Sequence, residues 1–182
     1  MNNPTKQTIR RDMKIHRSRL SEETRLKAEL AVLNSLEQDL RFIKCRNIVA
    51  YWSMPDELPT QKIIETLGTS HNIFLPVIVG QTLSLRLYEG TKRLVKEPRF
   101  GVMQPISSVE LLPDAARQTA ILVPGIAFAP NGQRIGHGNG YYDRMLIQYL
   151  TAYKIGIAFV GQHYHRLPVE PHDVPMDRVI FA

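Results

Sequence analysis

The sequence predicts an α/β protein with a three-layer α/β/α architecture, in which helices flank a mostly parallel sheet. Apolar, β-rich segments alternate with segments of helical composition, an order typical of such sheets. Residues 120–123 have the apolar character of a fully buried central strand, and a Gly-rich loop separates this strand from a helix at residues 141–150. The chain of 182 residues has no repeat or linker. We therefore expect a single domain over residues 1–182.

The first two predicted helices lie at the N-terminal end. Residues 5–19 have helical composition without a strong apolar stripe. Ser21 is a suitable cap for a second helix that runs to about residue 40. Apolar side chains recur in that helix at every third or fourth position, so one face should pack on the core. These side chains are Leu26, Leu30, Leu33, Leu36 and Leu40.

The strands are predicted from β-forming residues and alternation. Residues 47–53 form the first strand, and a helix follows at 61–67 with Thr60 as its N-cap. Residues 72–79 form a second strand that should end near Pro76. Residues 82–88 alternate apolar and polar side chains, which indicates a strand with one solvated face. Residues 100–105 are predicted as a loop, 111–114 lead into the central strand, and 153–159 form the last strand.

The composition is that of an ordinary soluble globular protein, with 43% hydrophobic and 22% charged residues. The single cysteine, Cys45, cannot form an internal disulfide. No apolar run reaches the roughly 18 residues that a membrane span requires, and no signal peptide is evident, so we expect a cytoplasmic protein. We also expect a monomer, because the sequence shows no obvious extra apolar surface.

Positive charge is concentrated near the N-terminus, within a formal net charge of +6. Such a segment can serve nucleic acid, a nucleotide or a polyglutamate tail. Aromatic residues do not interleave with the basic ones, and no RNA-binding motif is present, so we expect no nucleic-acid partner. The basic residues are Arg10, Arg11, Lys14, His16, Arg17 and Arg19.

The glycine-rich stretch before residue 141 is the most informative part of the chain. Consecutive glycines let backbone amides approach a ligand, and the positive end of the following helix dipole favours negative charge. Arg134 can add a bidentate contact to a phosphate, and Asp143 can hold a cation that bridges phosphate oxygens. The loop matches neither the P-loop nor the dinucleotide motif, so its spacing is also compatible with a purely structural turn. Asp143 could likewise be an ordinary acidic residue at the start of a helix. The glycines are Gly132, Gly136, Gly138 and Gly140.

The sequence from Pro124 to Phe128, followed by Gly-x-Arg-Ile-Gly-x-Gly-x-Gly-Tyr-Tyr-Asp at residues 132–143, resembles the signature of the 5-formyltetrahydrofolate cyclo-ligases, also called methenyltetrahydrofolate synthetases. Three further stretches match in the right order, so the resemblance covers nearly the whole chain. It implies an ATP-dependent cyclisation of 5-formyltetrahydrofolate to 5,10-methenyltetrahydrofolate, through a phosphorylated formyl group, with release of ADP and phosphate. The folate substrate can carry a polyglutamate tail.

The resemblance also implies roles for individual residues. Lys6 and Arg10 contact ATP phosphates, and Trp52 and Glu57 contact the folate. The ATP-binding set is completed by Arg134, Ile135, Gly136, His137, Gly138, Asn139, Gly140, Tyr141 and Tyr142. Residues 137–141 of that loop also face the folate, and Lys6, Arg134 and Tyr141 take part in catalysis. Asp143 and Asp173 hold Mg²⁺, with Asp177 as the second choice for the tail ligand. His137 and Asn139 depart from the residues that relatives often carry.

Three alternatives remain open on the sequence. The first is a non-catalytic, basic α/β module that binds a nucleotide or RNA, although such a module would not need Asp143 and Asp173 together. The second is a different ATP-dependent ligase on the same scaffold. The third is a zinc site, because His163 and His165 would point the same way on a strand and could combine with Asp173.

Overall fold

The computed structural model describes residues 4–182, so residues 1–3 of the expected domain lie outside the described part. Six strands form the main sheet in the order β10-β9-β6-β1-β2-β3. The first five of these are parallel to their neighbours, and β3 is antiparallel to β2, so the prediction of a mostly parallel sheet is confirmed. These strands are β1 (Asn47–Val49), β2 (Asn72–Val79), β3 (Thr82–Leu87), β6 (Thr119–Val123), β9 (Tyr153–Ala158) and β10 (Arg178–Phe181).

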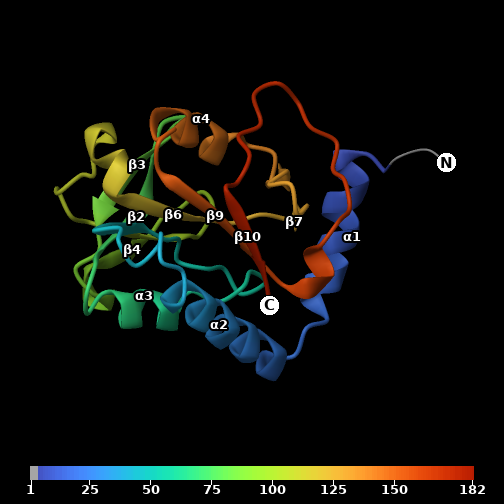
Figure 1. Cartoon of the computed structure of the whole chain (residues 1–182), viewed down its shortest axis with the longest axis horizontal. Coiled ribbons are helices and arrows are strands. Elements are labelled where there is room, and N and C mark those ends of the chain that lie inside the picture. The colour runs from blue at the N-terminus through green and yellow to red at the C-terminus, as the bar shows by residue number, and fades with distance from the viewer. Residues whose placement is uncertain (1–3) are drawn as a thin grey trace.

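Helices cover both faces of this sheet, which confirms the three-layer architecture (Figure 1). On one face, α2 (Glu22–Glu37) and α3 (Gln61–Leu67) pack with Ile48, Leu122 and Ile155 in one core cluster. On the other face, α4 (Tyr141–Gln148) packs with Val49 and Ile121. The two cores are therefore separated by the sheet, as alternating burial along a strand requires.

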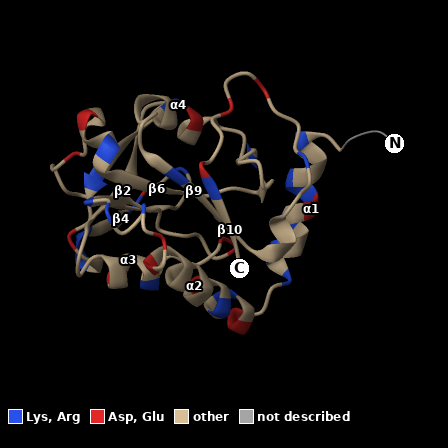
Figure 2. Cartoon of the chain, viewed as in Figure 1, with Lys and Arg blue, Asp and Glu red and all other residues tan. Residues whose placement is uncertain are grey.

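The first helix, α1 (Lys6–Ser18), lies beside the sheet and not on it (Figure 1). It packs through Ile9 and Met13 on a small hairpin made of β7 (Ala127–Phe128) and β8 (Arg134–Ile135). Ile9 and Met13 are four residues apart, so the helix does carry an apolar stripe, which the sequence analysis did not expect. Lys and Arg residues lie at several positions along α1, among residues of other kinds (Figure 2).

Several boundaries differ from the predicted ones. The first strand ends at Val49, and Pro76 lies inside β2 and does not end it. The hairpin of β7 and β8 interrupts the stretch that was predicted as one loop, and β10 was missed. A second small sheet pairs β4 (Leu94–Lys96) with β5 (Met103–Pro105). Of these two strands, β5 lies within residues 100–105, which were predicted as a loop, and β4 lies before them.

The buried face of α2 also differs from the prediction. Leu33 and Leu36 are buried as expected, but Leu26 and Leu30 are exposed, and Leu40 lies beyond the end of the helix. Their place is taken by the stripe of Ala28, Glu29, Val32, Leu33 and Leu36. The buried carboxylate of Glu29 explains the change, because it accepts a hydrogen bond from the backbone N–H of Lys62 at 2.8 Å. An acid was not expected in a core stripe.

Glu29 also replaces a predicted cap. Thr60 occupies the N-cap position of α3 but makes no side-chain capping bond to that helix. Its hydroxyl donates to the carbonyl of Tyr51 and accepts from the N–H of Ser53, so it braces the chain that leaves β1. The N-terminal turn of α3 is held from α2 instead. Within residues 4–182, no helix is both long enough and apolar enough to cross a membrane.

Candidate active site

A cavity of about 990 Å³ opens where the strand order reverses, between β1 and β6. Successive connections leave on opposite sides at such a point, and ligands of open α/β sheets bind beside the carboxyl ends of its strands. The cavity is lined from β1 by Tyr51, Trp52 and Glu57, which follow the end of that strand, and from β6 by Pro124. The fold therefore creates a ligand-sized space where the sequence analysis placed the site.

All fifteen residues named as site residues on the sequence line this one cavity, although they come from four distant parts of the chain. They are Lys6, Arg10, Trp52, Glu57, Arg134, Ile135, Gly136, His137, Gly138, Asn139, Gly140, Tyr141, Tyr142, Asp143 and Asp173. Asp177 does not line it. Its Oδ2 instead accepts from the backbone N–H of Lys154 at 2.7 Å and lies 3.1 Å from Nζ of the same lysine. Asp177 therefore anchors β9, and its selection as the second metal candidate is corrected.

The glycine-rich loop presents an array of free donors. Among residues 4–182, no acceptor takes a hydrogen bond from the backbone N–H of any residue from Gly136 to Asp143. Gly138 and Gly140 have φ angles of 101° and 67°, which only glycine adopts readily, and Gly140 is the N-cap of α4. Asn139 does not have a positive φ. A concave run of unpaired amides that ends at a helix N-terminus stabilises negative charge.

Arg134 and Asp143 form a buried ion pair at the base of this loop. Nη2 of Arg134 donates to Oδ1 of Asp143 at 2.7 Å, and Nη1 donates to the carbonyl of Pro124 at 3.3 Å. The arginine side chain is only 4% exposed, and its Nε has no partner within the described residues. The backbone N–H of Val174 also donates to Oδ1 of Asp143, at 3.3 Å. Arg134 thus carries a buried positive charge with unused hydrogen-bonding capacity.

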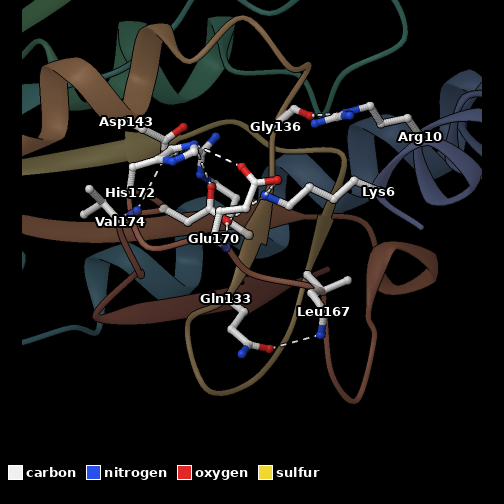
Figure 3. Close-up of polar contacts among 11 residues, drawn as sticks. Lys6, Arg10, Gln133, Gly136, Asp143, Leu167, Glu170, His172 and Val174 are labelled. Atoms are coloured by element: carbon white, nitrogen blue, oxygen red, sulfur yellow. Dashed lines mark hydrogen bonds and ion pairs between the residues drawn. The ribbon is translucent and has the colours of Figure 1, made fainter. Parts of the chain in front are cut away.

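Helix α1 contributes two cations to the wall of the cavity (Figure 3). Nζ of Lys6 lies 2.7 Å from Oδ2 of Asp173 and 3.4 Å from Oε1 of Glu170. Burial opposes ionisation of Asp173, but hydrogen bonds from Lys6 and from the backbone of Glu170 outweigh it and hold its pKa below the usual value. Nε of Arg10 donates to the carbonyl of Gly136 at 2.8 Å. Lys6 and Arg10 are four residues apart and therefore lie on the same face of α1.

Glu57 and Trp52 line the cavity from the segment that follows β1. One carboxylate oxygen accepts from the N–H of Met54 at 2.9 Å, and the other lies 3.2 Å from Nε2 of His137. Trp52 and Tyr88 have ring centroids 6.0 Å apart. A buried carboxylate and an indole that line the same cavity suit a flat heterocycle that carries N–H groups. Burial and, next, the charge of Glu57 raise the pKa of Tyr142, so its hydroxyl stays protonated.

The apolar wall includes part of the segment predicted as a loop. Phe100, Val102 and Met103 line the cavity, and the ring of Phe100 lies edge-on to that of Tyr141 at 6.0 Å. Sequence reasoning missed Glu170 and His172, which lie on the cavity rim beside Asp173. Only the local Glu-x-His-Asp pattern could have pointed to them.

The zinc site considered on the sequence is not formed. His163 and His165 are not on a strand, and their ring centroids are 6.0 Å apart. Within residues 4–182, the group of three or more His, Cys, Asp or Glu side chains that lie close enough to share one ion consists of Glu170, His172 and Asp173. Asp173 thus groups with its sequence neighbours and with Lys6, and not with the two earlier histidines.

The cavity lies at the point where the strand order reverses, and free amides, cations and carboxylates surround it. This arrangement is that of an α/β protein that can bind a polyanionic ligand beside a flat, polar one. Comparison with known proteins identifies the family. The model of the 5-formyltetrahydrofolate cyclo-ligase family matches residues 2–182, so the chain belongs to that family.

Individual relatives agree with this assignment. The chain is 31% identical to the 5-formyltetrahydrofolate cyclo-ligase of Haemophilus influenzae, with 97% of each chain covered. It is 27% identical to the mouse enzyme of the same name, over 98% of this chain and 94% of the relative. The solution structure of Aquifex aeolicus 5,10-methenyltetrahydrofolate synthetase superposes with a TM-score of 0.83 at 29% identity, covering 97% of this chain and 89% of that one.

Proposed function

We propose that the protein catalyses the ATP-dependent cyclisation of 5-formyltetrahydrofolate to 5,10-methenyltetrahydrofolate, with release of ADP and phosphate. The observation that carries this proposal is the convergence of all the expected site residues on one cavity, in a chain that matches the cyclo-ligase family over residues 2–182. Members of the family that match this chain over nearly its full length bear the same enzyme name.

The reaction has two steps. The formyl oxygen attacks the γ-phosphorus of ATP, the bond from that phosphorus to its bridging oxygen breaks, and ADP leaves. The nitrogen at position 10 then attacks the activated formyl carbon and gives up its proton, and the bond between that carbon and the phosphate oxygen breaks. Phosphorylation is needed because the unmodified formyl oxygen is a poor leaving group. Positioning and charge neutralisation can supply most of the catalysis in such a transfer.

The phosphate side of the site is assigned to the loop and α1. The free amides of residues 136–140 and of the N-terminal turn of α4 donate hydrogen bonds to the phosphate oxygens. Lys6 and Arg10 add positive charge from α1, and Arg134 adds it from below the loop. Arg134 is well suited to this role because its guanidinium is already fixed by Asp143 and Pro124 and therefore needs little reorganisation. Ile135, His137, Asn139, Tyr141 and Tyr142 complete the wall.

Mg²⁺ is assigned to Asp143 and Asp173. Both carboxylates line the cavity, and each keeps one oxygen without a hydrogen-bond donor among residues 4–182, Oδ2 of Asp143 and Oδ1 of Asp173. Hard carboxylate oxygens beside a phosphate site are the donors that Mg²⁺ prefers. When bound, the ion would neutralise charge on the phosphate oxygens. Lys6 must share Asp173 with the ion, which the flexible lysine stem permits.

The folate side is assigned to Trp52, Glu57 and Tyr141. Glu57 accepts hydrogen bonds from the amino and ring N–H groups of the pterin, and Trp52 packs against that ring. Holding the formyl group against the γ-phosphate in this way can supply roughly 7–11 kcal/mol of the barrier reduction.

The test is to mix the purified protein with 5-formyltetrahydrofolate and follow the near-ultraviolet absorbance of the methenyl product. We expect a rise that requires both ATP and Mg²⁺. If the protein binds ATP but the absorbance does not rise, the folate assignment is wrong. The cavity would then be a nucleotide site whose second substrate is unknown.

A further inference from the structure

Three alternate glycines of the loop each lie against a guanidinium group. A Cβ built on any of them would approach that group closely, so the glycines make room for arginines as well as for a ligand. The pairs and the closest approaches are Gly136 with Nη1 of Arg134 at 2.8 Å, Gly138 with Cζ of Arg10 at 3.4 Å, and Gly140 with Nη1 of Arg144 at 2.6 Å. Arg134 and Arg10 line the cavity, but Arg144 does not.

Arg144 instead joins the loop to the turn between β2 and β3 from outside the cavity. Its Nη2 donates to the carbonyl of Asn139 at 2.9 Å, and its Nε donates to the carbonyl of Gln81 at 2.8 Å. Its guanidinium also lies 5.3 Å from the ring centroid of Tyr141. The hydroxyl of Tyr141 donates to the carbonyl of Gly80 at 3.3 Å and so reinforces the same connection.

The place of Arg144 is unusual for a cation. It is the fourth residue of α4, near the positive end of the helix dipole, where positive charge is disfavoured by a few tenths of a kcal/mol to about 1 kcal/mol. Its two charge-assisted contacts with carbonyls offset that cost. The helix itself does not favour an arginine here, whereas the contacts with the loop and the turn do.

Peptide geometry converts the contact with Asn139 into an orientation of the next amide. In a planar trans peptide, the carbonyl oxygen and the following N–H point in opposite directions. The peptides of the described chain contain no cis bond, so a carbonyl of Asn139 drawn toward Arg144 turns the N–H of Gly140 the other way. That N–H has no acceptor among residues 4–182, and Gly140 lines the cavity.

The same device operates at the other end of the loop. Arg10 holds the carbonyl of Gly136 at 2.8 Å, which turns the N–H of His137 the opposite way. Two arginines therefore fix two carbonyls, and each fixed carbonyl orients the amide that follows it.

We propose that Arg144 is a positioning residue, which pins the carbonyl of Asn139 so that the N–H of Gly140 faces the bound phosphate chain. The inference rests on one part of the proposed function, namely that ATP binds at this loop. Arg144 acts on the phosphate side through the backbone. Among the described residues, its link to the folate side is the ring of Tyr141, which the bond from the Tyr141 hydroxyl to Gly80 also holds. Loss of Arg144 therefore weakens ATP far more than the second substrate.

The test compares Arg144→Met, which keeps the aliphatic stem, with Arg144→Lys, which keeps the charge but cannot span both carbonyls. Arg11→Met is the matched control, because Arg11 is an exposed helical arginine paired only with its neighbour Asp12 among the described residues. For each protein we would measure the Kd for ATP with Mg²⁺ by calorimetry, and the KM for ATP and for the folate substrate. We expect Arg144→Met to raise the Kd and KM for ATP about tenfold, Arg144→Lys to recover little of that loss, and the KM for the folate to stay within about twofold. Arg11→Met should match the wild type.

Each other outcome overturns the inference. An ATP affinity within twofold of wild type in Arg144→Met would show that the contact positions nothing. Equal losses for both substrates would indicate a general structural role, and full recovery in Arg144→Lys would indicate charge alone. If the wild type binds ATP but does not cyclise the folate, the proposed function fails while the Kd series still decides the role of Arg144. If the wild type does not bind ATP, both fail.

Discussion

Nε2 of His137 lies 3.2 Å from Oε1 of Glu57, and this contact joins the glycine-rich loop to the segment that follows β1. The Glu57 side chain is only 8% exposed, and its second oxygen is held by the N–H of Met54. The carboxylate is therefore oriented from two directions by the protein itself. Pre-orientation of this kind reduces the entropy lost when a ligand binds.

Glu57→Gln should weaken the folate far more than ATP. The amide replaces one acceptor oxygen with a donor, which leaves a pterin N–H group facing another N–H group in a buried place. We expect the KM for the folate substrate to rise at least about tenfold and the KM for ATP to change by less than about twofold. Initial rates with each substrate varied in turn provide the measurement. Glu65→Gln, at an exposed acid of α3, is the control, and equal losses for both substrates would contradict the assignment.

Asp143→Asn should raise the Mg²⁺ concentration that half-maximal activity requires by about tenfold or more, because one charged oxygen ligand is lost. A chelator should abolish wild-type activity, and added Mg²⁺ should restore it. The matched control is Asp177→Asn, since Asp177 lies outside the cavity and contacts Lys154. A shift in Asp177→Asn with none in Asp143→Asn would reverse the assignment.

Truncation of Leu36 and of Leu26 tests which face of α2 packs on the core. Both leucines were predicted to lie on that face, but only Leu36 is buried. Leu36 is 0% exposed and Leu26 is 50% exposed. Truncation of a buried leucine to alanine leaves a cavity, so Leu36→Ala should lower the free energy of unfolding by about 2–5 kcal/mol. The same truncation at Leu26 should change it by no more than about 0.5 kcal/mol. Urea unfolding measures both, and similar losses at the two positions would mean that Leu26 is also packed.

The failure at α2 shows where sequence reasoning reached its limit. The leucines form one stripe, but the buried stripe is turned around the helix from it and takes in Ala28, Glu29 and Val32, so the spacing of the leucines alone could not select the buried side. The selection is made by Glu29, whose carboxylate caps α3 from across the interface. Such a contact joins residues 33 positions apart and leaves no local signal. Likewise, Arg178 begins a strand that only becomes recognisable when paired with β9.

The site was more predictable than the packing around it. Glycines, Arg134 and Asp143 lie within one short stretch whose chemistry can be read locally, and the family signature supplied Lys6, Glu57 and Asp173. The contacts that hold this set together are not local. His137 meets Glu57 across 80 positions, and Arg144 reaches Gln81 across 63. Sequence reasoning therefore named the groups that line the cavity and missed Arg144, which contacts the loop from outside it.

Asp39 should make the stability of the protein depend on pH in the acid range. Burial opposes ionisation of Asp39, but hydrogen bonds from Tyr153, the backbone of Phe42 and Arg178 outweigh it and lower its pKa from the usual value of 3.8. Because the folded state has the lower pKa, the stabilisation is fully present above the unfolded pKa of about 3.9 and is lost as pH falls through the folded value.

Asp39→Asn isolates this contribution. At pH 7 we expect the variant to unfold about 1–3 kcal/mol more easily than wild type, because Arg178 and the two backbone donors lose a charged acceptor. The difference should stay constant from pH 7 down to about pH 5 and then shrink as pH falls below 4, where the wild-type carboxylate takes up its proton. Urea unfolding of both proteins at several pH values measures the difference. An unfolding difference that is the same at pH 3 and pH 7 would show that the loss comes from packing and not from the ionised carboxylate.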